Sequence, residues 1–281
     1  MDAPIVFLVL LAALLHASWN ALVKTGPDPL LSLASFHVTA ALVAMPVIFQ
    51  VPLPNTACVP FLAASVAVHW LYYGLLSSAY RVGDLSHVYP LSRGIAPLLI
   101  AAASALVAGE FLPGLTMAGI VLASGGIILL SFSHGLPWRH DPKPVLFGLG
   151  TGLSIAAYTV IDGLGVRHSI DALSYISWLF VLEGTTFVPF IYFLRRNQVI
   201  EHWRQRGPTL VGGGLATAGA YGLVIYAMNH NPMAMVSALR ETSVLMAVLI
   251  GALVLKEGYG KVRVSAALLV VGGVLIMNLP A

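Results

Sequence analysis

The sequence has very few charged residues. Only 9% of its 281 residues are Asp, Glu, Lys or Arg, whereas 58% are hydrophobic, and the mean hydropathy is +0.90. A typical water-soluble domain has about 25% charged residues. This shortage of charge excludes an ordinary soluble protein and indicates a polytopic membrane protein.

The chain also lacks the residues that many enzymes and metalloproteins need. Its single cysteine, Cys58, allows no intrachain disulfide and no cysteine metal cluster. No His-x-x-x-His or Glu-x-x-His pair occurs inside an apolar span, so neither a metal nor a cofactor is expected. Gly83-Asp84 lacks the earlier glycine of a Gly-x-Gly-Asp protease motif, and no Gly-x-Ser-x-Gly elbow is present. We therefore expect no catalytic residues.

Apolar runs of about 20 residues, each long enough to cross a bilayer, are separated by clusters such as Gly26-Pro27-Asp28-Pro29. The first run follows no basic segment and is expected to stay uncleaved. The longer connections are expected at 133–144 and 195–208. We predict ten spans, at 4–23, 30–49, 59–80, 86–108, 114–131, 145–164, 171–194, 209–228, 233–255 and 262–279.

An apolar span with an arginine near its start occurs twice. Aligning Arg93 with Arg240 places Glu110 on Glu257 at the same offset of 147 residues. The chain is thus expected to contain a first five-span repeat at 1–132, a connecting loop at 133–144 and a second repeat at 145–281. Because five is an odd number, the second repeat must enter the membrane from the opposite side.

The loop charges agree with this inversion. Among the even-numbered loops only the sixth holds a basic residue, Arg167, and two further arginines lie within spans. The positive-inside rule therefore predicts cytoplasmic odd-numbered loops and periplasmic termini, in the cytoplasmic (inner) membrane. The odd-numbered loops hold the other eleven of the 14 basic residues, namely Lys24, Arg81, Arg139, Lys143, Arg195, Arg196, Arg204, Arg206, Lys256, Lys261 and Arg263.

Inverted repeats that enclose a central cavity are a recurrent transporter design. Because no Walker-type glycine loop is present, this chain is not expected to hydrolyse ATP. The basic residues lie in short loops, so the sequence pI of about 9.1 does not indicate nucleic acid. An intramembrane enzyme and a non-transporting membrane partner remain alternatives of other classes.

Three features are similar to a known family: LLHASWNALVK (residues 14–24), the paired segments that end at Gly109-Glu110 and Lys256-Glu257, and the Gly-Gly steps at 125–126 and 272–273. With these features the sequence resembles the EamA transporters of the drug/metabolite transporter (DMT) superfamily. This resemblance implies ten helices in two inverted five-helix repeats. The stretches LSHVYPLSRGIAPLL, AAYTVIDGLGVR and ALRETSVLMAVLIGALVLKE are similar to a subgroup associated with phosphonate utilisation.

The two intramembrane arginines are the main candidates for substrate binding. An arginine in hydrocarbon costs about 2.5–3.5 kcal/mol on insertion scales and is expected to face a cavity or a partner. Arg93 shares a face with Tyr89 and Ser86, so we expect it to contact an anionic substrate group. Arg240 is followed by Glu241, and we expect these two to pair, although Glu241 could instead bind a substrate ammonium or carry a proton.

Other polar side chains fall on shared helix faces by their spacing. They can line the cavity, or the aromatic rings can pack between helices and Asn20 can bond across helices. The further candidates for substrate binding are His16, Trp19 and Asn20 in the first span, His69 and Tyr73 in the third, Tyr158 in the sixth and Tyr221 in the eighth.

Three titratable residues are candidates for proton coupling: Glu183, His69 and Asp162. Because Asp162 lies near the predicted end of its span, a solvated capping role is also expected for it. Glu183 could instead be protonated and hydrogen-bonded to a neighbouring hydroxyl.

These patterns predict a secondary transporter of a small polar metabolite with an anionic group, such as an amino acid, an organic acid or an organophosphonate. The alternative within the family is an exporter of drug-like or cationic amphipathic compounds. The expected partners are the substrate and the lipid bilayer, with a coupling proton as a further candidate, and no oligomeric state is predicted.

Overall fold

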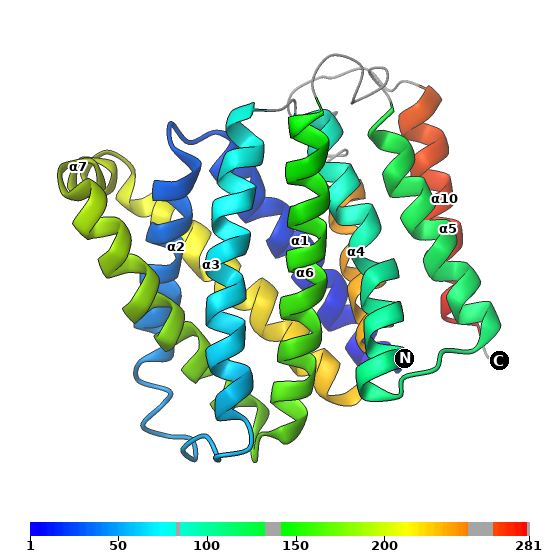
Figure 1. The fold of residues 1–281 in the computed structure, drawn as a ribbon, viewed down its shortest axis with the longest axis horizontal. Helices are drawn as coiled ribbons and strands as arrows, with labels where there is room; N and C mark the ends of the chain where they lie inside the picture. Colours follow the sequence, from blue (N-terminus) through cyan, green and yellow to red (C-terminus); the bar gives the residue numbers. More distant parts are fainter. Residues whose placement is uncertain (83–84, 133–141, 247–260, 280–281) are drawn as a thin grey trace.

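The computed structural model is helical throughout and describes residues 1–82, 85–132, 142–246 and 261–279 (Figure 1). The side chains of residues 80–88 also lie outside the described part. The helices are α1(Ala3–Lys24), α2(Pro29–Ala44), α3(Val59–Val82), α4(Leu85–Ala108), α5(Gly114–Leu130), α6(Lys143–His168), α7(Ala172–His230), α8(Met233–Arg240) and α10(Lys261–Met277).

The all-α fold class is confirmed, and the first six predicted spans correspond to α1–α6. Among the described residues, five helices (α1, α3, α4, α6 and α7) are long and apolar enough to cross a membrane, whereas α2 and α5 are apolar but shorter. The predicted ten-span inverted repeat remains a prediction, because 247–260 lie outside the described residues.

The predicted connection at 195–208 is helical and not a loop. The helix α7 runs for 59 residues through both the seventh and the eighth predicted spans, and only Arg195 has non-helical dihedral angles (φ −141°, ψ 36°). Figure 1 shows the sharp bend that results, close to one end of the molecule. The charged residues after Arg195 form helical turns instead of a loop.

The ninth predicted span is interrupted. The helix α8 ends at Arg240 with Glu241 as its C-cap, a turn follows at 241–242, and helical residues resume at 243–246. The remainder of this span, 247–255, lies outside the described residues. This interruption lies at Arg240 and Glu241, the two adjacent charged residues of the predicted span.

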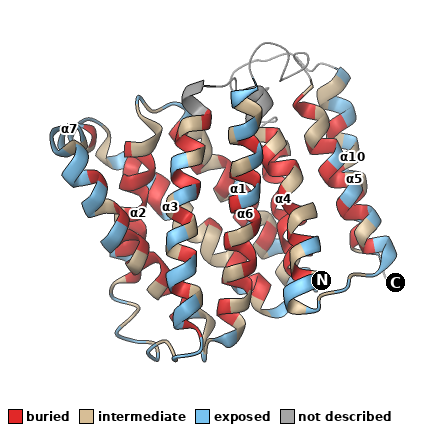
Figure 2. Ribbon diagram, in the orientation of Figure 1, coloured by how far each residue is buried: buried red, intermediate tan, exposed pale blue. Residues whose placement is uncertain are grey.

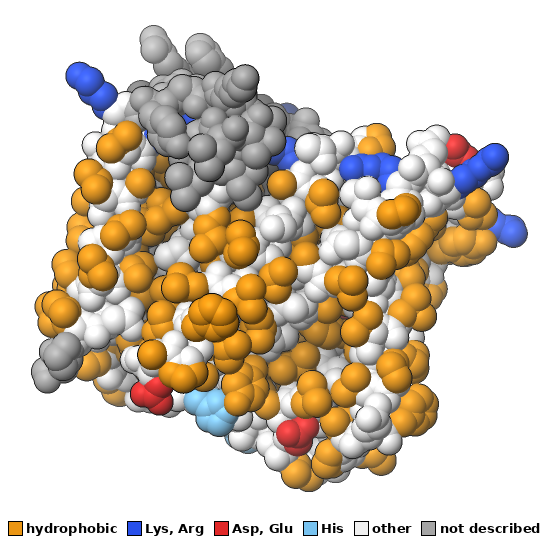
Figure 3. All heavy atoms as spheres, turned by 180° about the vertical axis from the view of Figure 1, so that it is seen from behind, with side chains coloured by type: hydrophobic (Ala, Val, Ile, Leu, Met, Phe, Trp, Pro, Cys, Tyr) orange, Lys and Arg blue, Asp and Glu red, His pale blue; other side chains and the backbone are white. Residues whose placement is uncertain are grey.

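The molecule has an apolar outside and an interior where polar residues are buried. Large side chains such as Phe7, Leu106 and Phe193 are exposed on the outer faces of their helices, whereas the inward faces are buried (Figure 2). Figure 3 shows apolar atoms over most of one face, with Lys and Arg gathered along one edge. This distribution suits a protein surrounded by lipid.

At each end of the molecule, loops that are predicted to lie on the same side of the membrane contact one another. At one end Asp28, which caps α2, lies 2.6 Å from Arg195 at the bend of α7. At the other end Arg167 lies 2.6 Å from Glu110 and donates to the Asn231 carbonyl. The start of α1 and the end of α10 lie at this second end (Figure 1). The termini and the even-numbered loops therefore share one end.

The helices α5 and α10 pack closely because small residues face each other. A Cβ at Gly126 would lie 2.8 Å from Leu269 Cβ and 2.9 Å from the Ala266 carbonyl oxygen, whereas one at Gly125 would meet nothing within 4 Å. Of the two glycines in this Gly-Gly step, only Gly126 is therefore required by packing.

We expect Gly126→Ala to destabilise the protein by about 1–3 kcal/mol, because the added methyl overpacks the interface. Gly125→Ala is the matched control and should be neutral, or slightly stabilising through its higher helix propensity. Thermal unfolding of both variants in detergent measures the difference. Equal midpoints for the two variants would show that α5 and α10 separate without cost.

Candidate functional site

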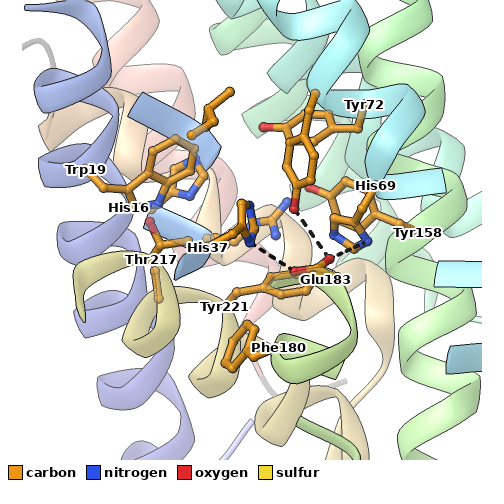
Figure 4. A pocket seen from close by; sticks show the side chains of 14 residues that line it. His16, Trp19, His37, His69, Tyr72, Tyr158, Phe180, Glu183, Thr217 and Tyr221 are labelled. Atoms are coloured by element: carbon orange, nitrogen blue, oxygen red, sulfur yellow. Dashed lines mark hydrogen bonds and ion pairs between the residues drawn. The ribbon is translucent and has the colours of Figure 1, made fainter. Parts of the chain in front are cut away.

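A small cavity lies inside the helical bundle between α1, α2, α3, α6, α7 and α8 (Figure 4). The cavity has a volume of about 50 Å³, which is room for a few waters. The lining residues are His16, Trp19, Leu33, His37, His69, Tyr72, Tyr73, Tyr158, Phe180, Glu183, Thr217, Ala220, Tyr221 and Arg240.

The cavity brings together many of the residues singled out in the sequence. Seven predicted substrate-binding residues line it: His16, Trp19, His69, Tyr73, Tyr158, Tyr221 and Arg240. The proton-coupling candidate Glu183 also lines it, so residues from both candidate groups share one space.

Other predicted residues lie elsewhere. Asn20 donates to the carbonyl of His16 in its own helix and does not line the cavity. Tyr89, Arg93, Glu241 and Asp162 also lie outside the lining, and the side chain of Ser86 is outside the described residues.

Glu241 joins the two arginines in a buried cluster. Its Oε2 lies 2.7 Å from Arg93 Nε, and its Oε1 lies 3.5 Å from an Arg240 terminal nitrogen. All three side chains are at most 3% exposed. With all three groups ionised, the cluster retains one positive charge. Each guanidinium thus has a carboxylate neighbour, which lowers the cost of burying it.

The expected pair of Arg240 and Glu241 is present, but Arg93 is the closer partner of this carboxylate; the substrate roles of both arginines stay predictions. Glu241 was expected to pair with its neighbour Arg240 and to leave Arg93 for the substrate. The carboxylate instead lies nearer to Arg93, and Arg240 lines the cavity. Glu241 thus reaches across to Arg93 on α4 and also accepts the longer hydrogen bond, 3.5 Å, from its neighbour Arg240.

Glu183 lies at the centre of a second buried cluster. Its carboxylate is 3.3 Å from His37 Nδ1 and 3.2 Å from His69 Nδ1, and it accepts a hydrogen bond of 3.4 Å from the Tyr73 hydroxyl. Figure 4 shows these three contacts converging on the carboxylate from α2 and α3.

His37 was missed in the sequence. It is 4% exposed and belongs to a span that was read only for its apolar length. The available signal was a titratable side chain in an otherwise apolar helix, which marks a functional position in a membrane.

Asp162 is not a solvated cap. It is fully buried, and it accepts hydrogen bonds from the hydroxyls of Tyr175, at 2.8 Å, and Tyr221. The helix α6 continues to His168, so Asp162 lies well inside it and not at its end. This expectation was therefore wrong.

Aromatic rings form much of the wall between the charged groups. The ring of Tyr158 stacks on His69 with centroids 4.2 Å apart, and Tyr221 meets His69 edge-on at 5.4 Å. Trp19 meets His16 edge-on at 4.8 Å. Such rings present apolar faces with polar tips, which suits a small molecule that has both kinds of surface.

Within the described residues, no group of three His, Cys, Asp or Glu side chains is arranged to hold a metal ion. The charged side chains that line the cavity are those of Arg240 and Glu183, and three histidines line it as well. These two residues do not pair with each other in the described structure, because each has its own partners.

Comparison with known proteins identifies a transporter domain. Residues 142–279 match the model of the EamA-like transporter family, which supports membership of the DMT superfamily. A solved structure titled "Crystal structure of protein" matches 99% of this chain and 97% of its own, with a TM-score of 0.78 and 15% identity. That identity shows a shared fold only. No curated protein sequence matches the chain.

The chain is accordingly a multi-pass membrane protein with an EamA-like transporter domain. The EamA family is a family of transporters, which argues against an enzyme. The match is to the family as a whole and does not extend to the phosphonate-associated subgroup.

Proposed function

We propose that the protein is a secondary transporter that moves a small polar metabolite with an anionic group across the cytoplasmic membrane. The two repeats, 1–132 and 145–281, would alternate in conformation around the cavity. The observation that carries the proposal is Arg240, a buried guanidinium that lines a cavity inside the bundle. A guanidinium presents a planar fork of donors that matches a carboxylate or a phosphonate.

The cavity also contains an acidic side chain, and this restricts the substrates that we expect to those with a cationic group as well as an anionic one. Glu183 also lines the cavity and can accept an ammonium group. Arg240 and Glu183 come from different helices, α8 and α7, so a small zwitterion can use one charge for each. An amino acid or an aminoalkyl phosphonate has this chemistry.

A second candidate is an exporter of cationic amphipathic compounds. It is favoured by the tyrosine rings and by Glu183, because a cation is attracted to aromatic faces and to a carboxylate. This candidate gives Arg240 no contact with the substrate.

Uptake into proteoliposomes made with the purified protein separates these candidates. The solutes are L-serine, 2-aminoethylphosphonate, succinate and tetraethylammonium, and protein-free liposomes are the control. We expect uptake of at least one of the three anion-bearing solutes and none of tetraethylammonium. Uptake of tetraethylammonium alone would contradict the anion proposal and favour the second candidate.

We further propose that both termini are periplasmic, because the odd-numbered loops hold eleven of the 14 basic residues. Alkaline phosphatase fused after Ala281 should be active, and a cytoplasm-dependent fluorescent protein fused there should be dark. A fusion of each reporter within 197–207 is the matched control and should give the reverse pattern. A bright fluorescent fusion at Ala281 would invert the assignment.

A further inference from the structure

We propose that Asp162 is a positioning residue of the substrate cavity, because it holds the Tyr221 ring in the cavity wall. Tyr221 lines the cavity, whereas Asp162 does not. The inference rests on the proposed transport function and gives Asp162 a role in substrate affinity instead of proton coupling. A carboxylate buried beside the cavity thereby affects a substrate that it does not touch.

The carboxylate of Asp162 is shared between two tyrosines of α7. Its Oδ1 accepts a hydrogen bond of 2.8 Å from the Tyr175 hydroxyl, and its Oδ2 accepts one from the Tyr221 hydroxyl. Asp162 and Tyr175 are fully buried. A buried hydroxyl that loses its acceptor is left unsatisfied at a cost in free energy. The two hydrogen bonds therefore fix the direction in which each tyrosine points.

The two tyrosines belong to different arms of α7. Tyr175 lies near the start of this helix, after the N-cap Asp171, whereas Tyr221 comes after the bend at Arg195. Asp162 lies on α6 and joins both arms. It thus fixes the side chain of Tyr221 relative to α6 as well as to the first arm of its own helix.

A glycine makes the contact with Tyr175 possible. A Cβ at Gly165 would overlap the Tyr175 hydroxyl and the end of its ring, so a side chain here would push the phenol away. Gly165 follows Asp162 by three residues and lies on the same face of α6. The space that this glycine leaves is what allows Tyr175 to reach the carboxylate.

The ring of Tyr221 belongs to a set of three rings in the cavity wall. It meets His69 edge-on with centroids 5.4 Å apart and Tyr158 edge-on at 5.7 Å, and these two stack on each other at 4.2 Å. All three line the cavity (Figure 4). Asp162 follows Tyr158 by one helical turn. The helix α6 therefore contributes one ring to this set and, one turn later, anchors the hydroxyl of another.

This anchor determines what the substrate meets. The Tyr221 hydroxyl is directed to a residue outside the cavity lining, so its ring is the part that faces the ligand. A fixed ring can contact the apolar part of a small molecule or attract its ammonium group. A ring that is free to turn would instead move within a cavity of only about 50 Å³ and take space that the substrate needs. Loss of the anchor should therefore weaken binding although no group that touches the substrate is removed.

Counterflow kinetics test the proposal, with 2-aminoethylphosphonate or L-serine as the probe, whichever the wild type transports. We expect Asp162→Ala, which removes both acceptor oxygens, to raise KM about 3- to 10-fold. The maximal rate should stay within about twofold, as expected for a change in binding alone. Tyr221→Phe should raise KM to a similar extent. Tyr175→Phe is the matched control, because it removes a hydroxyl from the same carboxylate but lies outside the cavity lining, and its KM should be unchanged.

The double variant Asp162→Ala with Tyr221→Phe separates positioning from direct contact. If Asp162 acts through Tyr221, the double variant has no higher KM than the worse single variant. Additive effects would mean that the Tyr221 hydroxyl itself contacts the substrate, and would overturn the proposal. So would equal KM values for Tyr221→Phe and Tyr175→Phe, a comparison that stands even where Asp162→Ala does not fold. Loss of pH-driven uptake with a normal counterflow KM in Asp162→Ala would assign Asp162 to proton coupling instead.

Fluorine NMR of the purified protein with 3-fluorotyrosine at position 221 tests the anchor without a substrate. We expect Asp162→Ala to shift or broaden the resonance. Asp171→Asn, a change at the N-cap of α7 where Asn serves as well as Asp, should leave it in place. An unchanged resonance in Asp162→Ala would show that Asp162 does not hold the ring. Absence of wild-type counterflow with both probes contradicts the proposed function for these solutes, while the resonance still decides the anchor.

Discussion

Glu241→Gln is expected to lower the free energy of unfolding by about 3–5 kcal/mol. The substitution removes the carboxylate that lies 2.7 Å from Arg93 Nε in a fully buried position. Breaking a buried ion pair by removing one partner leaves an uncompensated charge, which costs more than the pair contributes. The two guanidinium groups of this cluster would then have no carboxylate between them.

Thermal unfolding and expression yield in detergent measure this effect. Glu201→Gln, a change at an exposed position, is the matched control and should be neutral. The double variant Arg93→Gln with Glu241→Gln should recover most of the loss, because it removes both charges. If Glu241→Gln and Glu201→Gln unfold at the same temperature, the cluster does not stabilise the protein.

Arg240→Lys is expected to weaken substrate binding by about 1.5–3 kcal/mol, the range for a hydrogen bond to a charged group. This corresponds to a roughly 10- to 100-fold increase in KM. The change keeps the charge in the cavity but removes the planar fork of donors. Folding should be affected less than by Arg93→Lys, because Arg240 lies farther from Glu241 than Arg93 does.

Counterflow kinetics of Arg240→Lys, Arg93→Lys and the exposed control Arg204→Lys measure the prediction. Arg93→Lys should mainly lower stability. The sequence alone predicted the opposite, with Arg93 in contact with the substrate and Arg240 paired with Glu241. A normal KM for Arg240→Lys together with a raised KM for a folded Arg93→Lys would show that Arg93, and not Arg240, contacts the substrate.

The sequence predicted the helical class and most helix positions, because a span must be apolar over about 20 residues. It did not predict that the connection at 196–208 is itself helical. Apolar length alone cannot distinguish a loop from a helix that continues beyond the lipid. There, Gln205 donates to the Glu201 carboxylate across one turn, which is a helical spacing within the polar segment.

The candidate site was predicted only in part because its contacts join distant segments. Alignment of the repeats located Arg93 and Arg240 but could not show that Glu241 reaches across to α4. In the same way, Glu183 had no visible partner in the sequence. Its histidines lie on α2 and α3, far along the chain, and only the packing of these helices brings them together.

The central claim is that Arg240 and Glu183 bind the two ends of one small substrate. Competition against counterflow of L-serine or 2-aminoethylphosphonate, whichever the protein transports, tests it most directly. Each zwitterion is compared with analogues that lack one charge: ethanolamine and glycolate for L-serine, and ethylamine and ethylphosphonate for 2-aminoethylphosphonate. We predict that the zwitterion competes at least about tenfold better than either analogue, since each lost charged contact costs about 1.5 kcal/mol or more. Equal competition by the amine alone would contradict the claim and show that Arg240 does not contact the substrate.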